Sequence, residues 1–126
     1  LSEANLSVVN FSGAYLRGAN LNNAYLRGAN LKSTNLSLAN LKQAHLNMAD
    51  LRGADLSETN LKMADLSEAN LYLADLSEAN LNLADLRGAD LSRADLFTAN
   101  FSRADLFGAV LSKTQALNTN FNEAIL

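Results

Sequence analysis

Hydrophobic residues recur at every fifth position along the whole chain. Counted in fives from Leu1, the first position of each unit is Leu or Phe at 25 of 26 places, and the exception is Ala116. Two positions before each of these lies a small residue, which is Ala at 20 of 25 places, and the residue between them is Asn or Asp at 19 of 25. The repeating unit is therefore Ala-(Asp/Asn)-Leu-x-x, and its register never slips.

A period of five fits neither a helix nor a straight strand. Five residues turn through about 500° on an α-helix, so successive Leu side chains would circle the helix in steps of about 140°. In a straight strand, alternate Leu residues would point to opposite faces. Within one unit, however, Ala and Leu are two positions apart and share a face, and Asn or Asp points the other way. Each unit is therefore predicted to form a short segment with Ala and Leu inward, followed by a two-residue corner.

Identical residues also recur every twenty positions, which predicts four sides per coil with like residues stacked. The series are Asn20, Asn40, Asn60, Asn80, Asn100 and Asn120; Asp55, Asp75 and Asp95; and Asp65, Asp85 and Asp105. At ~4.8 Å between coils, about six coils make a rod ~30 Å long. The asparagine series is placed to form a ladder of side-chain amides.

This pattern resembles the pentapeptide-repeat family over the whole chain, since 25 units share the Leu centre, the preceding Ala and the Asn or Asp between them. The resemblance implies an all-β fold, a right-handed parallel quadrilateral β-helix, as a single domain over residues 1–126. The repeat weakens at Val110, Gln115 and Ala116, so 110–126 is predicted to form an irregular last coil or cap. Because the family is plentiful in cyanobacteria and plastids, the resemblance also implies such a source.

Composition narrows the possible functions. The net charge of −3, from 13 acidic and 10 basic residues, is too mild to favour specific nucleic-acid binding. The absence of cysteine removes disulfides, thiolate metal sites and cysteine nucleophiles. No apolar run approaches the ~20 residues of a membrane span. No signal peptide is visible at the start of the chain, which predicts a cytoplasmic protein, with a removed leader as the open alternative.

Candidate catalytic and metal-binding residues are few, so we expect neither an enzyme nor a cofactor. His45 is the only histidine, and it occupies an Asn/Asp position without further N or S ligands for a metal. Asp65 and Asp85 would lie ~5 Å apart, near the separation in retaining glycosidases, but a convex rod has no sugar-binding cleft. The six glycines all occupy the second position after the Leu or Phe of the repeat, which predicts corners with positive φ and not a phosphate-binding loop.

Two surfaces are candidates for contact with a partner. One side of the rod carries five acidic residues against Arg17 alone, and the acidic residues are Asp55, Glu58, Asp75, Glu78 and Asp95. The alternative is that this side is an ordinary solvated surface. The second candidate is an apolar end formed by Phe97, Phe107, Leu117 and Leu126. That end is predicted to act either as a cap over the core or as an interface for a homodimer or another protein.

The sequence therefore predicts a non-enzymatic structural or protein-interaction module of unknown biological role, with an unidentified protein partner and no membrane contact. The alternative implied by the resemblance is a DNA mimic that inhibits or protects a type II topoisomerase, DNA gyrase. The relatives with that activity are longer, strongly acidic and dimeric. Here basic residues adjoin the acidic side, which makes the alternative the weaker one.

Overall fold

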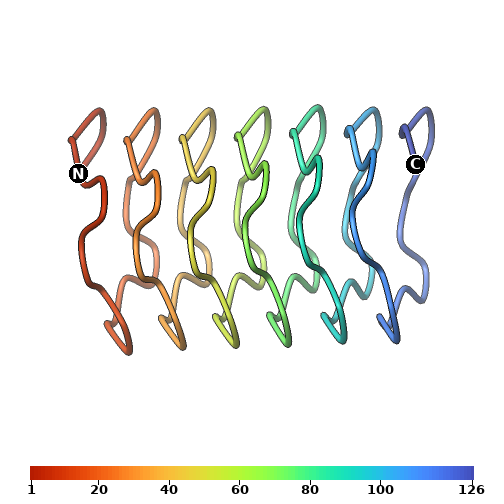
Figure 1. Ribbon diagram of the computed structural model, residues 1–126, viewed down its shortest axis with the longest axis horizontal. Coiled ribbons are helices and arrows are strands. Elements are labelled where there is room, and N and C mark those ends of the chain that lie inside the picture. Colours follow the sequence, from red (N-terminus) through yellow and green to blue (C-terminus); the bar gives the residue numbers. More distant parts are fainter.

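The computed structural model describes all 126 residues as a rod of repeated loops. Figure 1 shows loops of the same shape lying side by side, with the N- and C-termini at opposite ends. The chain contains no α-helix and no extended strand. Its regular structure consists of single bridged residues at every fifth position from Asn5 to Ile125, with a two-residue turn before each of them.

Every bridge is parallel and joins residues twenty positions apart, from Asn5 with Tyr25 to Asp105 with Ile125. Four five-residue units therefore separate each residue from the one stacked on it. This confirms the period of twenty that the recurring Asn and Asp residues predicted. It also follows that outward side chains at positions i and i+20 are neighbours on one side of the rod.

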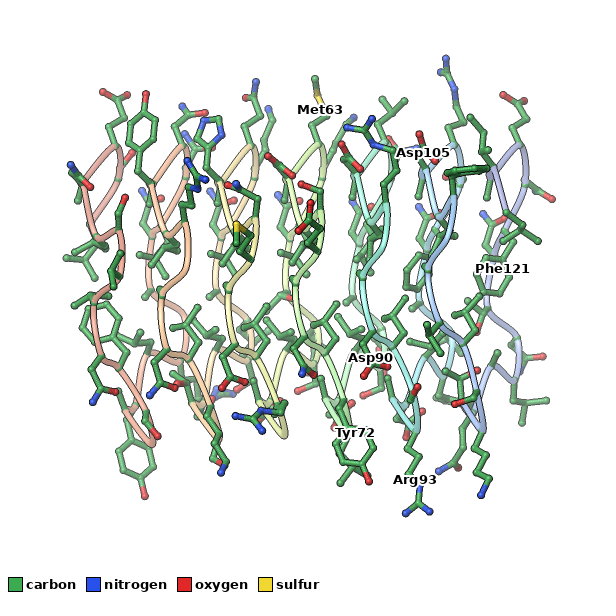
Figure 2. The ribbon with its side chains drawn as sticks, in the orientation of Figure 1. Met63, Tyr72, Asp90, Arg93, Asp105 and Phe121 are labelled. Carbon is green, nitrogen blue, oxygen red and sulfur yellow. The ribbon has the colours of Figure 1, made fainter.

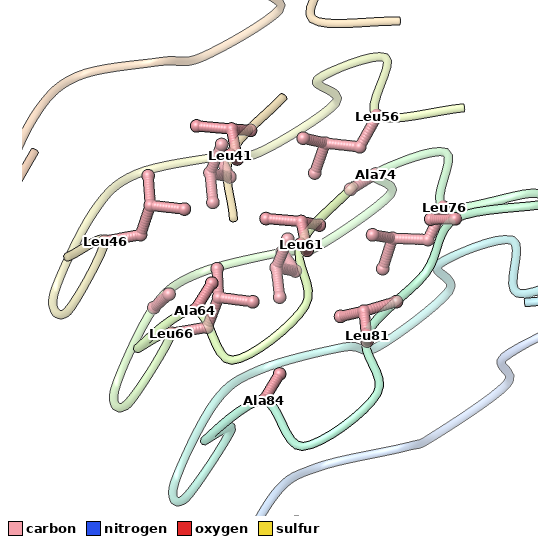
Figure 3. Packing of buried hydrophobic residues seen from close by; sticks show 14 of the residues in the cluster. Leu41, Leu46, Leu56, Leu61, Ala64, Leu66, Ala74, Leu76, Leu81 and Ala84 are labelled. Carbon is pink, nitrogen blue, oxygen red and sulfur yellow. The ribbon is translucent and has the colours of Figure 1, made fainter. Parts of the chain in front are cut away.

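The core is formed by the Leu, Phe and Ala positions of the repeat. Thirty-three buried hydrophobic residues make one cluster, and the central leucines, such as Leu61, have no exposed surface. Figure 3 shows leucines of successive coils pointing into one interior space, with the Ala methyl groups between them. A coil cannot bury this ring of leucines alone, so each coil depends on its neighbours for stability.

The backbone hydrogen bonds repeat in every unit that has a coil on both sides, and 61–65 is representative. Four of its five N–H groups donate to backbone carbonyls, three of them in adjacent coils and one across the corner. These bonds are Leu61 to Asn80 (2.8 Å), Met63 to Asn82 (3.0 Å), Asp65 to Ala44 (2.9 Å) and Ala64 to Leu61 (3.0 Å). Only the N–H of the first corner residue, Lys62, is left without a backbone acceptor.

That remaining N–H donates to a side chain, which explains the Asn/Asp position. In this unit Oδ1 of Asn60 accepts from the N–H of Lys62 at 3.2 Å. All 19 Asn and Asp residues at this position make the same bond to the residue two places on, as in an Asx turn. The predicted amide ladder is largely wrong, because only Asn120 donates to the asparagine stacked on it, Asn100, at 3.3 Å.

All 25 corners have positive φ at their second residue, as the glycine positions suggested, yet only six of these residues are glycine. The first corner residue keeps a negative φ, so each corner has the pattern of a type II turn. Nineteen corners place a residue with a side chain in this conformation, including Leu73 at 58° and Thr98 at 54°. The repeated interior bonds thus impose a backbone conformation that costs roughly 1–2 kcal/mol for such residues.

The last segment, 110–126, keeps the turns and bridges of the preceding coils. Val110, Gln115 and Ile125 form parallel bridges with the residues twenty positions earlier. The irregular last coil expected from the sequence is therefore not observed. Of its apolar residues, Leu117 at a corner and Leu126 at the inward position of the final unit are 67% and 74% exposed.

Candidate contact surfaces

The five predicted acidic residues lie on one side of the rod, which we call the acidic side. Asp55, Asp75 and Asp95 are joined by consecutive parallel bridges, so their side chains form a stack along this side. Glu58 and Glu78 are exposed at the adjoining corner, also twenty positions apart. The structure thus brings all five carboxylates together over three successive coils.

None of these five carboxylates forms an ion pair. Oδ1 of Asp55 and of Asp75 accepts from a neighbouring serine, and Oδ1 of Asp95 accepts from the N–H of Phe97. All ion pairs of the protein lie on other sides and corners, and they are Arg52–Asp50, Arg87–Asp85, Arg87–Asp105 and Arg103–Glu123. The negative charge of the acidic side is therefore uncompensated by contacts within the chain.

The charged stack has limits along the rod. In the same column Tyr15 and Asn35 precede Asp55, and Gln115 follows Asp95. Three stacked carboxylates at ~4.8 Å per coil extend over only ~10 Å. The adjoining side carries four basic residues, Lys32, Arg52, Arg93 and Lys113, against Asp50 and Asp90.

Charge is also unequal along the length of the rod, a feature that the sequence-based prediction missed. Residues 4–49 contain four basic residues and no acidic one, whereas 50–105 contain eleven acidic and five basic residues. This charge asymmetry can be read from the sequence. The residue that forms the Asx turn is never Asp before Asp50 and is often Asp after it. Both residue types accept the same backbone bond, so this change alters charge without altering the fold.

Two aspartates on other sides are held by arginine. Nε and Nη2 of Arg52 donate to the two carboxylate oxygens of Asp50 at 2.8 and 2.6 Å, and Arg87 binds Asp85 in the same way. These hydrogen bonds lower the pKa of Asp50 and Asp85, against the opposing effect of partial burial. Because folding lowers these pKa values, the ion pairs stabilise the fold at any pH above the range in which carboxyl groups ordinarily titrate. That stabilisation is lost as the pH falls through the lowered pKa. All four side chains are solvated, so the effect is small.

The histidine and several serines make contacts that stabilise the local structure of the rod. His45 stacks on Tyr25 with ring centroids 4.8 Å apart and an interplanar angle of 7°. No group of three or more His, Asp or Glu residues is arranged to hold a metal ion. The hydroxyl groups of Ser57, Ser67 and Ser77 donate to the aspartate two positions earlier, at 2.6 Å, and thereby reinforce the Asx turns.

The four residues of the predicted apolar end do not form one patch. Phe97 and Leu117 are twenty positions apart and share a corner, with 41% and 67% of their surface exposed. Phe107 is ten positions from Phe97, which places it two corners away, on the diagonally opposite corner. Ile125 and Leu126 follow Asp105 and Leu106 by twenty positions, just before that corner, and they and Phe107 are all more than half exposed. The structure therefore separates the predicted end into two apolar corners.

None of the chain forms a helix with the length and apolar character that a membrane crossing requires. No curated protein matches the chain in sequence. Among solved structures, a pentapeptide repeat protein from the Arabidopsis thaliana thylakoid lumen is 31% identical, with a TM-score of 0.74 over 75% of this chain and 66% of that protein. One from the cyanobacterium Cyanothece 51142 is 37% identical, with a TM-score of 0.57 over 76% of this chain and 63% of that protein.

A third structure, QnrB1, described as a plasmid-mediated fluoroquinolone resistance protein, is 20% identical and shares the fold, with a TM-score of 0.59 over 91% of this chain and 71% of QnrB1. This chain spans about two thirds or less of the Arabidopsis and Cyanothece proteins. The family model for pentapeptide repeats matches residues 1–33, 34–72, 66–103 and 99–126. Together with the repeated corners and bridges, these matches show that the chain belongs to the pentapeptide repeat family and has its fold, a right-handed quadrilateral β-helix.

Proposed function

We propose that this chain is a non-enzymatic protein-interaction module whose acidic side binds a basic segment of a partner protein. The observation that supports this most is the stack of carboxylates on that side, because none of them is neutralised by the chain itself. A regular backbone holds Asp55, Asp75 and Asp95 at a fixed spacing, so a partner meets a charge pattern that needs no rearrangement. Binding through this side is weak and sensitive to salt, since the charges are solvated.

The charge of the acidic side provides a direct test. We expect the triple variant Asp55→Asn/Asp75→Asn/Asp95→Asn to bind a hexalysine peptide about tenfold more weakly than the wild type, because three exposed pairs at about 0.5 kcal/mol each are removed. Asparagine still accepts the Asx-turn bond, so the fold is retained. Isothermal titration calorimetry at low and high salt measures the difference.

The matched control carries the same change of net charge on a different side, as Asp65→Asn/Asp85→Asn/Asp105→Asn. Arg87 already neutralises part of that column, because it contacts both Asp85 and Asp105. We therefore expect this control to lose much less affinity. Equal losses in the two triple variants would show that only net charge matters and would contradict a specific acidic contact side.

The alternative function, mimicry of DNA at a type II topoisomerase such as DNA gyrase, fits this surface less well. B-DNA carries one charge per ~1.7 Å of axis, so a rod of about six coils and ~30 Å would need close to 18 negative charges. The net charge here is −3, and the basic residues Lys32, Arg52 and Arg93 adjoin the acidic side. The likeness to QnrB1 supports the shared fold alone, and a cytoplasmic location stays a prediction.

Self-association is a second proposal, supported by the exposed pair Phe97 and Leu117 on one corner. We expect the wild type to dimerise in sedimentation experiments at low and high salt, because burial of apolar surface is not screened by ions. The variant Phe97→Asp/Leu117→Asp is expected to be monomeric. The control Met63→Asp/Leu83→Asp changes another exposed apolar pair, twenty positions apart on a different corner, and is expected to stay dimeric. A monomeric wild type under all conditions would rule out this contact.

A further inference from the structure

The rod has a single hollow on its surface, at one corner of three successive coils. Its volume is about 290 Å³, and it is lined by Lys32, Ser33, Arg52, Gly53, Tyr72 and Leu73. The hollow exists because Gly53 carries no side chain at a corner position where most coils have one. Ser33 lies before it in the same column and Leu73 after it, so the gap is bounded by a small polar residue and a large apolar one.

The polar groups around this hollow are mostly hydrogen-bond donors. Arg52 uses Nε and Nη2 to bind Asp50, which fixes the guanidinium and leaves Nη1 without a partner in the chain. Lys32 forms no ion pair. Asp55 follows Gly53 closely, but its Oδ1 is held by the backbone and hydroxyl of Ser57, toward the next corner. Because Asp50 offsets the charge of Arg52, the hollow keeps one net positive charge, that of Lys32.

The remaining wall is apolar. Leu73 is 52% exposed, and Tyr72 precedes it on the same corner. Figure 2 shows Tyr72 and Arg93 extending from the same long edge of the rod, away from the core. Tyr72 and Leu73 thus form one apolar wall, and Lys32 with the free Nη1 edge of the paired Arg52 forms the opposite wall, which donates hydrogen bonds. Pockets of this kind, which take a single anchor side chain, carry much of the affinity in protein interfaces.

We propose that this hollow binds an aromatic side chain that adjoins a carboxylate on a partner protein. The aromatic ring packs against Tyr72 and Leu73, above the exposed backbone of Gly53, and the carboxylate lies near Lys32 and the free edge of Arg52. This inference rests on the proposed role as an interaction module and adds a second contact of opposite charge to the acidic side. A partner that uses both contacts would combine a basic segment with a separate aromatic-acidic anchor.

Two capped dipeptides test the chemistry of the site on the whole protein. We expect acetyl-Phe-Asp-amide to cause saturable shifts of the amide resonances of residues 32–33, 52–53 and 72–73 in two-dimensional NMR spectra. Acetyl-Phe-Asn-amide, which has the same shape without the charge, is expected to bind about two- to fivefold more weakly, as loss of one solvated ion pair predicts. In Lys32→Gln the difference between the two peptides is expected to shrink.

The variant Gly53→Leu fills the hollow and is expected to abolish binding. Leucine is compatible with this backbone, because Leu38, Leu73 and Leu83 occupy equivalent corners with φ of 58–61°, close to the +62° of Gly53. Gly88→Leu is the matched control at another corner. A Cβ at either glycine would lie 3.7 Å from a side chain of the preceding coil, Ser33 or Glu68. We expect Gly88→Leu to bind the Asp peptide as the wild type does.

Three results would overturn the inference: no saturable shifts up to about 10 mM peptide, equal binding of the two peptides, or binding that survives Gly53→Leu. None of them bears on the hexalysine titration, which reports on a different side of the rod. Failure of the hollow and failure of the acidic side are therefore distinguishable.

Discussion

Replacing Leu61 with alanine is expected to lower the free energy of unfolding by about 2–5 kcal/mol, the range found for buried leucines. Leu61 has no exposed surface and belongs to the column of Leu41 and Leu81, which lie in the adjacent coils. The leucines are fixed by a backbone that repeats on all sides, so the interior cannot collapse readily into the space left by the truncation. Urea denaturation followed by circular dichroism measures the loss, and the native spectrum itself should lack α-helix.

The neighbouring residue Lys62 is the control for this experiment. Its side chain points outward from the corner, and its N–H is bonded to Asn60 whatever the side chain is. Lys62→Ala is therefore expected to change the free energy of unfolding by no more than about 0.5 kcal/mol. Comparable losses in Leu61→Ala and Lys62→Ala would contradict the assignment of inward and outward positions.

Replacing the small inward residue of the repeat with a larger one is expected to have the second large effect on the free energy of unfolding. Ala84 is 1% exposed and stacks between Ala64 and Ala104 in the interior. Ala84→Leu inserts three further carbon atoms into a filled core, which is expected to cost about 1–3 kcal/mol or more. The same urea titration measures this loss, and the cooperativity of unfolding reports whether the adjacent coils are displaced.

Threonine at the same position is the informative control, because the chain already uses it. Thr34 and Thr59 are buried in equivalent slots, and their hydroxyls donate to the carbonyls of Phe11 (2.8 Å) and Leu56 (2.6 Å). Ala84→Thr is therefore expected to cost less than about 1 kcal/mol, since its hydroxyl finds the corresponding acceptor. If Thr and Leu were equally damaging, the volume added to the core would not account for the loss.

Much of this architecture could be predicted because the repeat encodes it locally. The two-residue separation of Ala and Leu sets the inward face, and the recurrence of Asn at every twentieth position sets the coil. The first signal is present on every side, so the burial of a residue such as Leu61 follows from its place in the repeat. The family resemblance supplied what spacing alone could not, namely the handedness of the coil.

The errors in the prediction share a physical cause, which is that backbone bonds dominate this fold. Asn residues were expected to bond to each other along the rod, but their side chains satisfy the corner N–H groups instead. Segment 110–126 was expected to be irregular because its side chains depart from the repeat. Its backbone stays regular because the ladder bonds do not depend on which residue points outward, as Val110 and Gln115 show.

The contact surfaces were predictable to different degrees. The acidic side could be identified because its residues share two columns of the repeat. The same rule separates Phe97 from Phe107, since ten positions amount to half a coil, so the prediction of one apolar end was wrong in joining them. The hollow at Gly53 could not be predicted in this way, because it depends on how the side chains of Arg52 and Tyr72 fill the space around a missing one.

The parallel bridges between residues twenty positions apart have a mechanical consequence. The bonds between coils run along the rod, so a force that pulls the two ends apart acts on the coils in series, and the outermost coil has a neighbour on one side only. Each coil that detaches would release twenty residues, or ~70 Å of extended chain, at one step. The rod would therefore resist compression and bending as a solid body but lengthen under tension by discrete, nearly equal increments.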